Sequence, residues 1–320
     1  MNVTIGKRKS VSPPNSPKNP IRPSMRIKKK KKNVKVQKKL SGKKIITVES
    51  TRRSRVTGAS PWIDKSLCDK NPKLSKARVV IGIPTTGIIR YEWAVARWGQ
   101  IIPVNWSNSE IAQAYTQIGP IGYLVDDARN IICHRFLEDK PADWLFFIDH
   151  DTILPPDCYV KINEYIRKAT EPCVCGLYYA KGDPAPPLVF RGRGNSYFDD
   201  WKRGDKVRVD AVPMGCTLIH RSLMVESAKI SPDYKVPGIN KPTKKVFETP
   251  RRVWFDAENK QYLKDTGTED IYWSDKIMDN DIFKKAGWKK HAKMKNPFLC
   301  DTSIFCKHID LTSGQQYPLD

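Results

Sequence analysis

Two aspartates and a histidine follow a short apolar run near the middle of the 320-residue sequence. The run Trp144–Ile148 has no polar side chain, which is typical of a buried central strand, and it ends at Asp149-His150-Asp151. In an open α/β sheet, ligands bind beyond the carboxyl ends of the strands, where alternate residues project in related directions. We therefore predict that Asp149 and Asp151 hold a divalent cation that bridges to a diphosphate. An acidic loop that caps the following helix is the alternative interpretation.

The segments around this acidic turn alternate between strand and helix patterns. Residues 78–84 form an apolar run that predicts a buried strand ended by Pro84, and the apolar residues of 124–136 have helical spacing. Residues 156–169 are predicted to form a helix, and 173–179 another strand. A strand, helix, strand order favours a mostly parallel sheet in a three-layer, Rossmann-like α/β sandwich.

Three further elements are predicted along the chain. Residues 100–104 are expected to form a second strand, and Val209–Ile219 a later one. Thr268 is a good N-cap, and Gly287 a good stop signal, for a helix with acidic residues in its first turn.

Small residues beside the predicted strands mark candidate ligand contacts. Thr85 and Thr86 follow Pro84, at a position where backbone amides commonly approach a nucleotide. Gly215 would let a ligand approach the backbone closely, although a β-bulge explains a glycine there equally well.

Several motifs, in this chain order, resemble those of GT-A-fold glycosyltransferases similar to family 2. The acidic turn with Pro155-Pro156-Asp157 resembles their Asp-x-Asp metal motif. The other matching segments are Arg129-Asn130, the strand with Gly215 and Arg221 after it, Glu269-Asp270 and His308. The resemblance covers about residues 77–310 and fits a divergent or virus-type branch better than a central one. No aspartate that would read uracil stands out, so the nucleotide base is not predicted.

The resemblance implies a role for each matching residue. Asp151 and His308 would coordinate Mn²⁺ or Mg²⁺, with Asp149 as a further ligand or a ribose contact. Asp270 would deprotonate the acceptor hydroxyl, Glu269 would position the acceptor, and direct displacement would invert the anomeric carbon. The residues implied to contact the nucleotide-sugar are Pro84, Thr85, Thr86, Arg129, Asn130, Asp149, His150 and Gly215.

Local explanations exist for two of these segments. Arg129 would equally suit the protein surface, paired with Asp126 or Asp127. Capping of a helix would by itself explain the acidic residues Glu269 and Asp270.

The net charge of +23 is concentrated at the N-terminus. The first 78 residues carry 24 Lys and Arg against three acidic residues, which leaves the rest of the chain close to neutral. We predict a disordered Lys/Arg-rich tail over 1–60, a linker over 61–76, a GT-A-like domain over 77–310 and a C-terminal tail over 311–320. The basic tail would bind nucleic acid, an anionic membrane surface or another polyanion, or serve as an address read by another protein.

The sequence lacks the apolar core of a signal peptide and any run of the roughly 20 apolar residues that cross a bilayer. We therefore expect a soluble, cytoplasmic protein without a transmembrane segment, acting in the host cell or the virion if the chain is viral. The eight cysteines form no Cys-x-x-Cys pair, which favours reduced, buried thiols.

The predicted function is metal-dependent transfer of a sugar from a nucleotide-diphosphate sugar to an acceptor hydroxyl. One alternative is a non-catalytic polyanion-binding or virion protein on a nucleotide-sugar-binding scaffold. Another is a metal-dependent nuclease, which the nearly neutral folded part disfavours because it lacks a basic groove. The sugar and the acceptor depend on loops whose geometry the sequence does not predict.

Overall fold

The computed structural model describes residues 78–103, 119–138, 142–193, 196–251, 253–264 and 267–319. The predicted basic tail over 1–60 and the linker over 61–76 lie outside these residues. Within the described part of the chain, no helix is long and apolar enough to cross a membrane.

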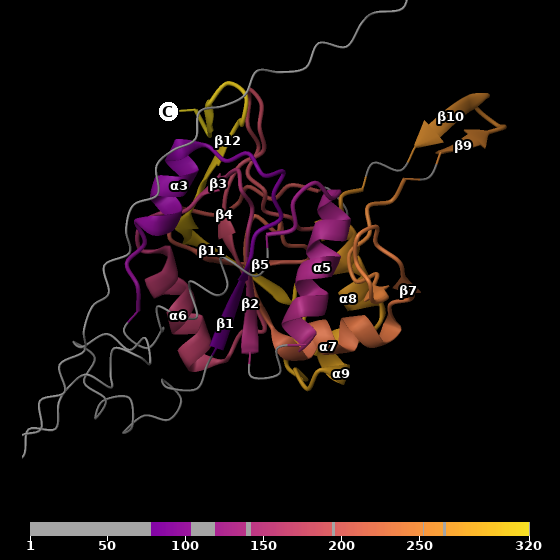
Figure 1. Cartoon of the computed structure of the whole chain (residues 1–320), viewed down its shortest axis with the longest axis horizontal. Coiled ribbons are helices and arrows are strands. Elements are labelled where there is room, and N and C mark those ends of the chain that lie inside the picture. The colour runs from indigo at the N-terminus through magenta and orange to yellow at the C-terminus, as the bar shows by residue number, and fades with distance from the viewer. Residues whose placement is uncertain are drawn as a thin grey trace, which may run out of the picture. The chain divides into compact units, whose positions relative to one another are not determined.

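A six-stranded sheet forms the centre of the fold (Figure 1). Its neighbouring strands are, in order, β1 (Arg78–Gly82), β2 (Ala142–Ile148), β6 (Cys216–His220), β4 (Cys173–Leu177), β11 (Phe298–Phe305) and β5 (Lys206–Val209). The pairs β1–β2 and β4–β11 are parallel. However, β6 runs antiparallel to both β2 and β4, and β5 runs antiparallel to β11. The α/β class is confirmed, but the sheet predicted to be mostly parallel is mixed, because β6 and β5 run opposite to their neighbours.

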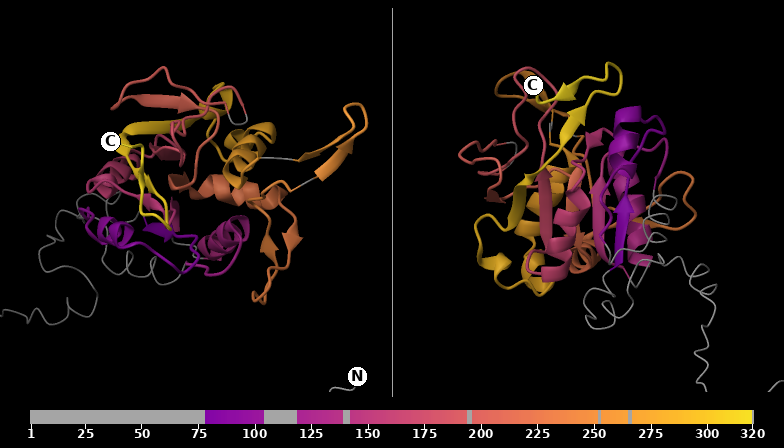
Figure 2. Two further views of the ribbon diagram at one scale, coloured as in Figure 1. Left: turned by 90° about the horizontal axis from the view of Figure 1, so that it is seen from above. Right: turned by 90° about the vertical axis from the view of Figure 1, so that its left-hand side faces the viewer.

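Helices cover both faces of this sheet (Figures 1 and 2). One face packs on α3 (Tyr91–Trp98) and α6 (Cys158–Lys168). The other packs on α5 (Val125–Glu138), α7 (Arg221–Ile230), α8 (Glu269–Asp279) and α9 (Ile282–Lys285). The sandwich therefore has three layers.

Strand β2 has apolar side chains on both of its faces, because a hydrophobic core lies on each side of it. Leu145 and Phe147 belong to the core on the α5 side, whereas Phe146 and Ile148 belong to the core on the α6 side. All four side chains are fully buried. Burial of each contributes about 1.5–3 kcal/mol relative to exposure, so β2 is fixed in the middle of the sandwich.

Smaller sheets surround the central one. Strands β3 (Thr152–Ile153), β12 (Lys307–Ile309) and β13 (Gln316–Tyr317) form an antiparallel sheet just beyond the end of β2. Two hairpins and a short 3-10 helix complete the fold: β7 (Asp233–Tyr234) with β8 (Thr243–Lys244), β9 (Val253–Asp256) with β10 (Gln261–Lys264), and η2 (His291–Lys293).

The predicted strand over 100–104 is wrong for its described residues, which form no strand. The Gln100 side-chain amide instead donates to the carbonyls of Ala96 and Pro155, each at 2.9 Å, and the Ile101 amide donates to the carbonyl of Pro156. These bonds tie the end of α3 to the loop before α6. Val104 lies outside the described residues.

Two other predicted elements are divided in the structure. The strand predicted over 209–219 is interrupted between β5 and β6 by a turn at Met214-Gly215, directly after Pro213, which has no amide to donate. The helix predicted to end at Gly287 is broken into α8 and α9, because Asp281 adopts a left-handed conformation with φ of 54°.

We expect Gly215→Ala to destabilise the fold, because a Cβ atom there would lie 2.6 Å from Thr152 Oγ1 and 2.7 Å from the Tyr178 hydroxyl. Overpacking of this kind costs about 1–3 kcal/mol. Chemical denaturation measures the change in free energy of unfolding. Gly267→Ala is the matched control, since its nearest neighbour would be Pro250 Cγ at 3.5 Å. Equal stability of the two variants would contradict the prediction.

Candidate functional site

The turn after β2 carries Asp149, His150 and Asp151 and is held by main-chain hydrogen bonds. The Asp149 amide donates to the carbonyl of Gly215 at 3.0 Å, and the Asp149 carbonyl accepts from the Trp93 indole at 2.8 Å. The Thr152 amide also donates to the Asp149 carbonyl. The acidic turn is therefore fixed by the turn before β6 on one side and by α3 on the other.

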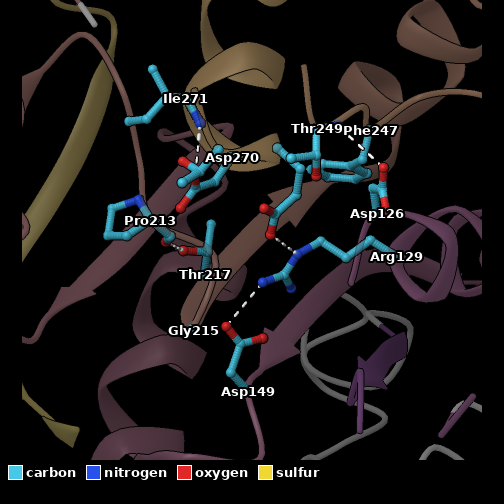
Figure 3. A network of polar contacts seen from close by, with 12 residues as sticks. Asp126, Arg129, Asp149, Pro213, Gly215, Thr217, Phe247, Thr249, Asp270 and Ile271 are labelled. Atoms are coloured by element: carbon cyan, nitrogen blue, oxygen red, sulfur yellow. Dashed lines mark hydrogen bonds and ion pairs between the residues drawn. The ribbon is translucent and has the colours of Figure 1, made fainter. Parts of the chain in front are cut away.

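A buried arginine joins this turn to α5 and α8. Arg129 Nη2 lies 2.9 Å from Asp149 Oδ2, and Arg129 Nε lies 2.9 Å from Glu269 Oε1. The guanidinium is 2% exposed and lies over the Phe147 ring. Figure 3 shows Arg129 reaching from its helix to the carboxylate of Asp149. Arg129 is therefore an interior residue bridging two acids, and the alternative of a surface pair with Asp126 or Asp127 is wrong.

Burial and pairing act in opposite directions on these charges. Burial raises the pKa of Asp149, and the adjacent Arg129 only partly offsets that rise. Burial disfavours the charge of Arg129, but the two carboxylates outweigh it and raise the pKa of the guanidinium above its usual value. Two buried atoms of this ion pair, Asp149 Oδ1 and Arg129 Nη1, have no hydrogen-bond partner in the described part of the chain. Buried polar atoms are normally satisfied, so these two mark a place for a ligand or water.

A second carboxylate, Asp151, has two basic partners. Its Oδ2 lies 2.7 Å from Lys181 Nζ and 3.2 Å from His308 Nε2. Pairing of β12 with β3 places His308 opposite Thr152 and so beside the acidic turn. Burial acts against ionisation of Asp151, but its contacts with His308 and Lys181 prevail and hold its pKa well below the usual range.

The imidazole of His308 has a fixed orientation. Its Nδ1 donates to the Tyr179 carbonyl at 2.9 Å, since a carbonyl can only accept. Its Nε2 faces Asp151. A histidine held through one ring nitrogen by a carbonyl presents the other nitrogen in the manner typical of metal ligands.

A pocket of about 180 Å³ lies between the acidic turn, the loop after β1 and the start of α5. The Thr86 hydroxyl lies 3.3 Å from His150 Nε2 across this pocket. The lining residues are Pro84, Thr85, Thr86, Tyr123, Val125, Ala128, Asp149, His150 and Asp151. The structure thus brings all three predicted loop residues together with the acidic turn.

Asp270 lies in the first turn of α8, next to Glu269. One of its oxygens accepts hydrogen bonds from the Thr268 hydroxyl and from the Ile271 amide, the latter at 2.8 Å (Figure 3). Burial, followed by the charge of Glu269, raises the pKa of Asp270 to about 6. Burial, followed by the charges of Asp149 and Asp270, raises the pKa of the Tyr178 hydroxyl.

Two predicted ligand contacts have structural roles instead. The Asn130 side chain is 1% exposed and bonds to the main chain of Phe247 and the hydroxyl of Tyr234. The space beside Gly215 is filled by Thr152 and Tyr178. Neither residue lines the pocket, because each is used to hold neighbouring protein segments.

Sequence reasoning missed Lys181 and Tyr123. Lys181 belongs to the long loop after β4, and nothing in its local sequence distinguishes it from other lysines; only the fold brings it to Asp151. Tyr123 lines the pocket from the residues before α5. Over the described ranges, no group of three or more His, Cys, Asp or Glu side chains is already arranged around a metal position.

We expect Arg129→Leu to lower the free energy of unfolding by about 3–5 kcal/mol at neutral pH, because it leaves buried carboxylates unpaired. Without Arg129, the folded-state pKa of Asp149 rises further above its unfolded value. Protonation of Asp149 then stabilises the folded variant at low pH. This stabilisation is lost as pH rises through the folded-state pKa of Asp149.

The loss in free energy of unfolding of Arg129→Leu relative to wild type should therefore be smaller near about pH 5 than near about pH 7.5, as measured by urea denaturation. Arg251→Leu is the control, since Arg251 is half-exposed and pairs with Asp126 at 3.2 Å. Loss of an exposed pair costs below about 1 kcal/mol. A pH-independent deficit for Arg129→Leu would contradict the prediction.

Comparisons with known proteins assign no family to this chain. No family model matches the sequence, and no curated protein matches it. Among solved structures, the chain is similar to one described as the crystal structure of A197 from STIV. The two share 19% sequence identity over 73% of this chain and 87% of that chain, with a TM-score of 0.40. Similarity at this level carries no argument about function.

Proposed function

We propose that this chain is a divalent-cation-dependent glycosyltransferase of GT-A-like fold that moves a sugar from a nucleotide-diphosphate sugar to an acceptor hydroxyl with inversion. The observation that carries the proposal is that Asp149 and Asp151 line one pocket, while Arg129 binds Asp149 and His308 faces Asp151. These residues come from separate segments of the chain, as the sequence resemblance implies. The α/β sandwich with carboxylates beyond a central strand is consistent with the same family.

The side chains present suit a hard divalent cation. Asp151 and His308 would hold it, and the unpartnered Oδ1 of Asp149 offers a further oxygen. Oxygen donors with a single imidazole suit Mn²⁺ at least as well as Mg²⁺. When bound, the cation would neutralise the charge that the diphosphate gains as a leaving group.

The pocket would hold part of the donor rather than all of it. Its volume of about 180 Å³ is smaller than the roughly 300–1,000 Å³ typical of ligand sites. Pro84, Thr85 and Thr86 allow close approach of a ligand to the backbone, and His150 closes the opposite side. The rest of the donor would then extend over the acidic turn.

Asp270 suits the role of the base that accepts the proton of the attacking hydroxyl. Its pKa of about 6 leaves it ionised at neutral pH and makes it a stronger base than an ordinary carboxylate. Glu269 is 7% exposed and bound to Arg129, and its charge helps to raise the pKa of the neighbouring Asp270. We therefore assign Glu269 to positioning rather than to proton transfer.

The first test is isothermal titration of nucleoside diphosphates and nucleotide-sugars into the protein with Mn²⁺ and with a chelator. We expect Mn²⁺-dependent binding that Asp151→Asn abolishes, because the variant removes the charge that holds the cation. Asp157→Asn is the control, since that carboxylate is half-exposed, pairs with Lys161 and lies outside the pocket. Absence of binding to any nucleotide would favour a non-catalytic scaffold protein.

The second test concerns the base. We expect release of nucleoside diphosphate from the donor to decline as pH falls below about 6, because Asp270 becomes protonated. Asp270→Asn should reduce the rate by about 10²–10⁴ without loss of donor binding, the range typical of general bases. Asp275→Asn, further along α8, is the control. A wild-type rate for Asp270→Asn would remove Asp270 from this role.

A further inference from the structure

The loop after β4 brings a positive charge to the carboxylate that the proposed function assigns to a metal ion. Lys181 Nζ donates to Asp151 Oδ2 at 2.7 Å, and His308 Nε2 lies 3.2 Å from the same oxygen. The lysine thus contacts the very oxygen that His308 faces. The contact from Lys181 is the shorter of the two.

A divalent cation and the Lys181 ammonium cannot share this position. A cation bound between Asp151 and His308 would lie within a few ångströms of the ammonium, where like charges repel strongly outside bulk water. Asp151 is also largely shielded, with a side chain that is 19% exposed. Screening by solvent is therefore weak, and one positive charge must leave when the other arrives.

The lysine is able to leave, whereas the histidine is not. The Lys181 side chain is 32% exposed, and Gly182 follows it with φ of 146°, a conformation that favours glycine. By contrast, His308 is held through Nδ1 by the Tyr179 carbonyl and lies in a paired strand. Of the two basic partners of Asp151, Lys181 is the exchangeable one.

We propose that Lys181 is a tethered cation that occupies the metal position of the unliganded protein and exchanges with a divalent cation when a nucleoside diphosphate binds. This inference rests on the proposed function. The diphosphate supplies negative charges that accept the displaced ammonium, so the metal and the nucleotide each favour the binding of the other. Lys181 therefore weakens the binding of the metal alone, and the metal binds more tightly together with the donor.

The exchange predicts how Mn²⁺ binding changes when the lysine is removed. Lys181→Gln should bind Mn²⁺ alone about fivefold more tightly than wild type, a factor of the order expected for one partly exposed ion pair. The gain in Mn²⁺ affinity that a nucleoside diphosphate produces should be smaller in Lys181→Gln, because the ammonium no longer links the two ligands. Lys181→Arg keeps the charge and should retain the weak wild-type affinity.

The experiment is titration of Mn²⁺, followed by electron paramagnetic resonance of the free ion, with no nucleotide and then with ADP, CDP, GDP or UDP. Lys161→Gln is the matched control, because Lys161 is also 32% exposed and is paired with an aspartate, Asp157, at 2.9 Å. Lys161→Gln also removes one positive charge, but beside Asp157 and not beside Asp151. Tighter Mn²⁺ binding by Lys181→Gln but not by Lys161→Gln is the expected result.

The other outcomes separate the inference from the proposed function. If wild type and Lys181→Gln bind Mn²⁺ with equal affinity, the exchange is overturned and the metal-dependent function stands. If both lysine variants gain affinity equally, the effect is one of overall charge, and the exchange is again overturned. If no variant binds Mn²⁺ with or without the nucleotides, both the inference and the metal dependence of the proposed function fail.

Discussion

The arrangement of this site depends on one buried ion pair, in which Arg129 neutralises Asp149 and Glu269. A charge in the interior is tolerated only when it is paired, so the guanidinium fixes the distance between the end of β2 and the start of α8. Asp151 lies two residues after Asp149, and Asp270 directly follows Glu269 in the first turn of α8. Arg129 thereby helps to position both carboxylates to which the proposed function assigns a role.

The ion pair with Arg129 also gives the two aspartates of the acidic turn different structural roles. Asp149 gives one oxygen to Arg129, and its backbone is held by Gly215 and Trp93, so it is chiefly part of the framework. Asp151 lies outside that framework, and its partners come from a loop and from the short strand β12. Asp151 is thus the member of the motif whose contacts are free to change on ligand binding.

Local patterns in the sequence predicted the elements that local physics determines. The apolar run of β2, the helical spacing of α5 and the acidic turn after Ile148 were all found, because each depends on neighbouring residues. The burial of Arg129 was not found, since its partner Glu269 lies 140 positions away in the chain. The contact between Lys181 and Asp151 was not found either, since these two residues lie 30 positions apart in the chain. Phe247 adjoins Asn130, and Thr152 and Tyr178 adjoin Gly215; sequence spacing does not tell which groups fill the space beside a residue.

The electrostatic environment separates carboxylates that are chemically alike. Asp151 lies against two basic side chains that hold its pKa well below the usual range, so it stays ionised and suits a cation at any physiological pH. Asp270 has a neighbouring acid and a buried position that raise its pKa to about 6. It therefore gains and loses a proton close to neutral pH. Two carboxylates pushed apart in this way are suited to different tasks in one site, one to hold positive charge and the other to accept a proton.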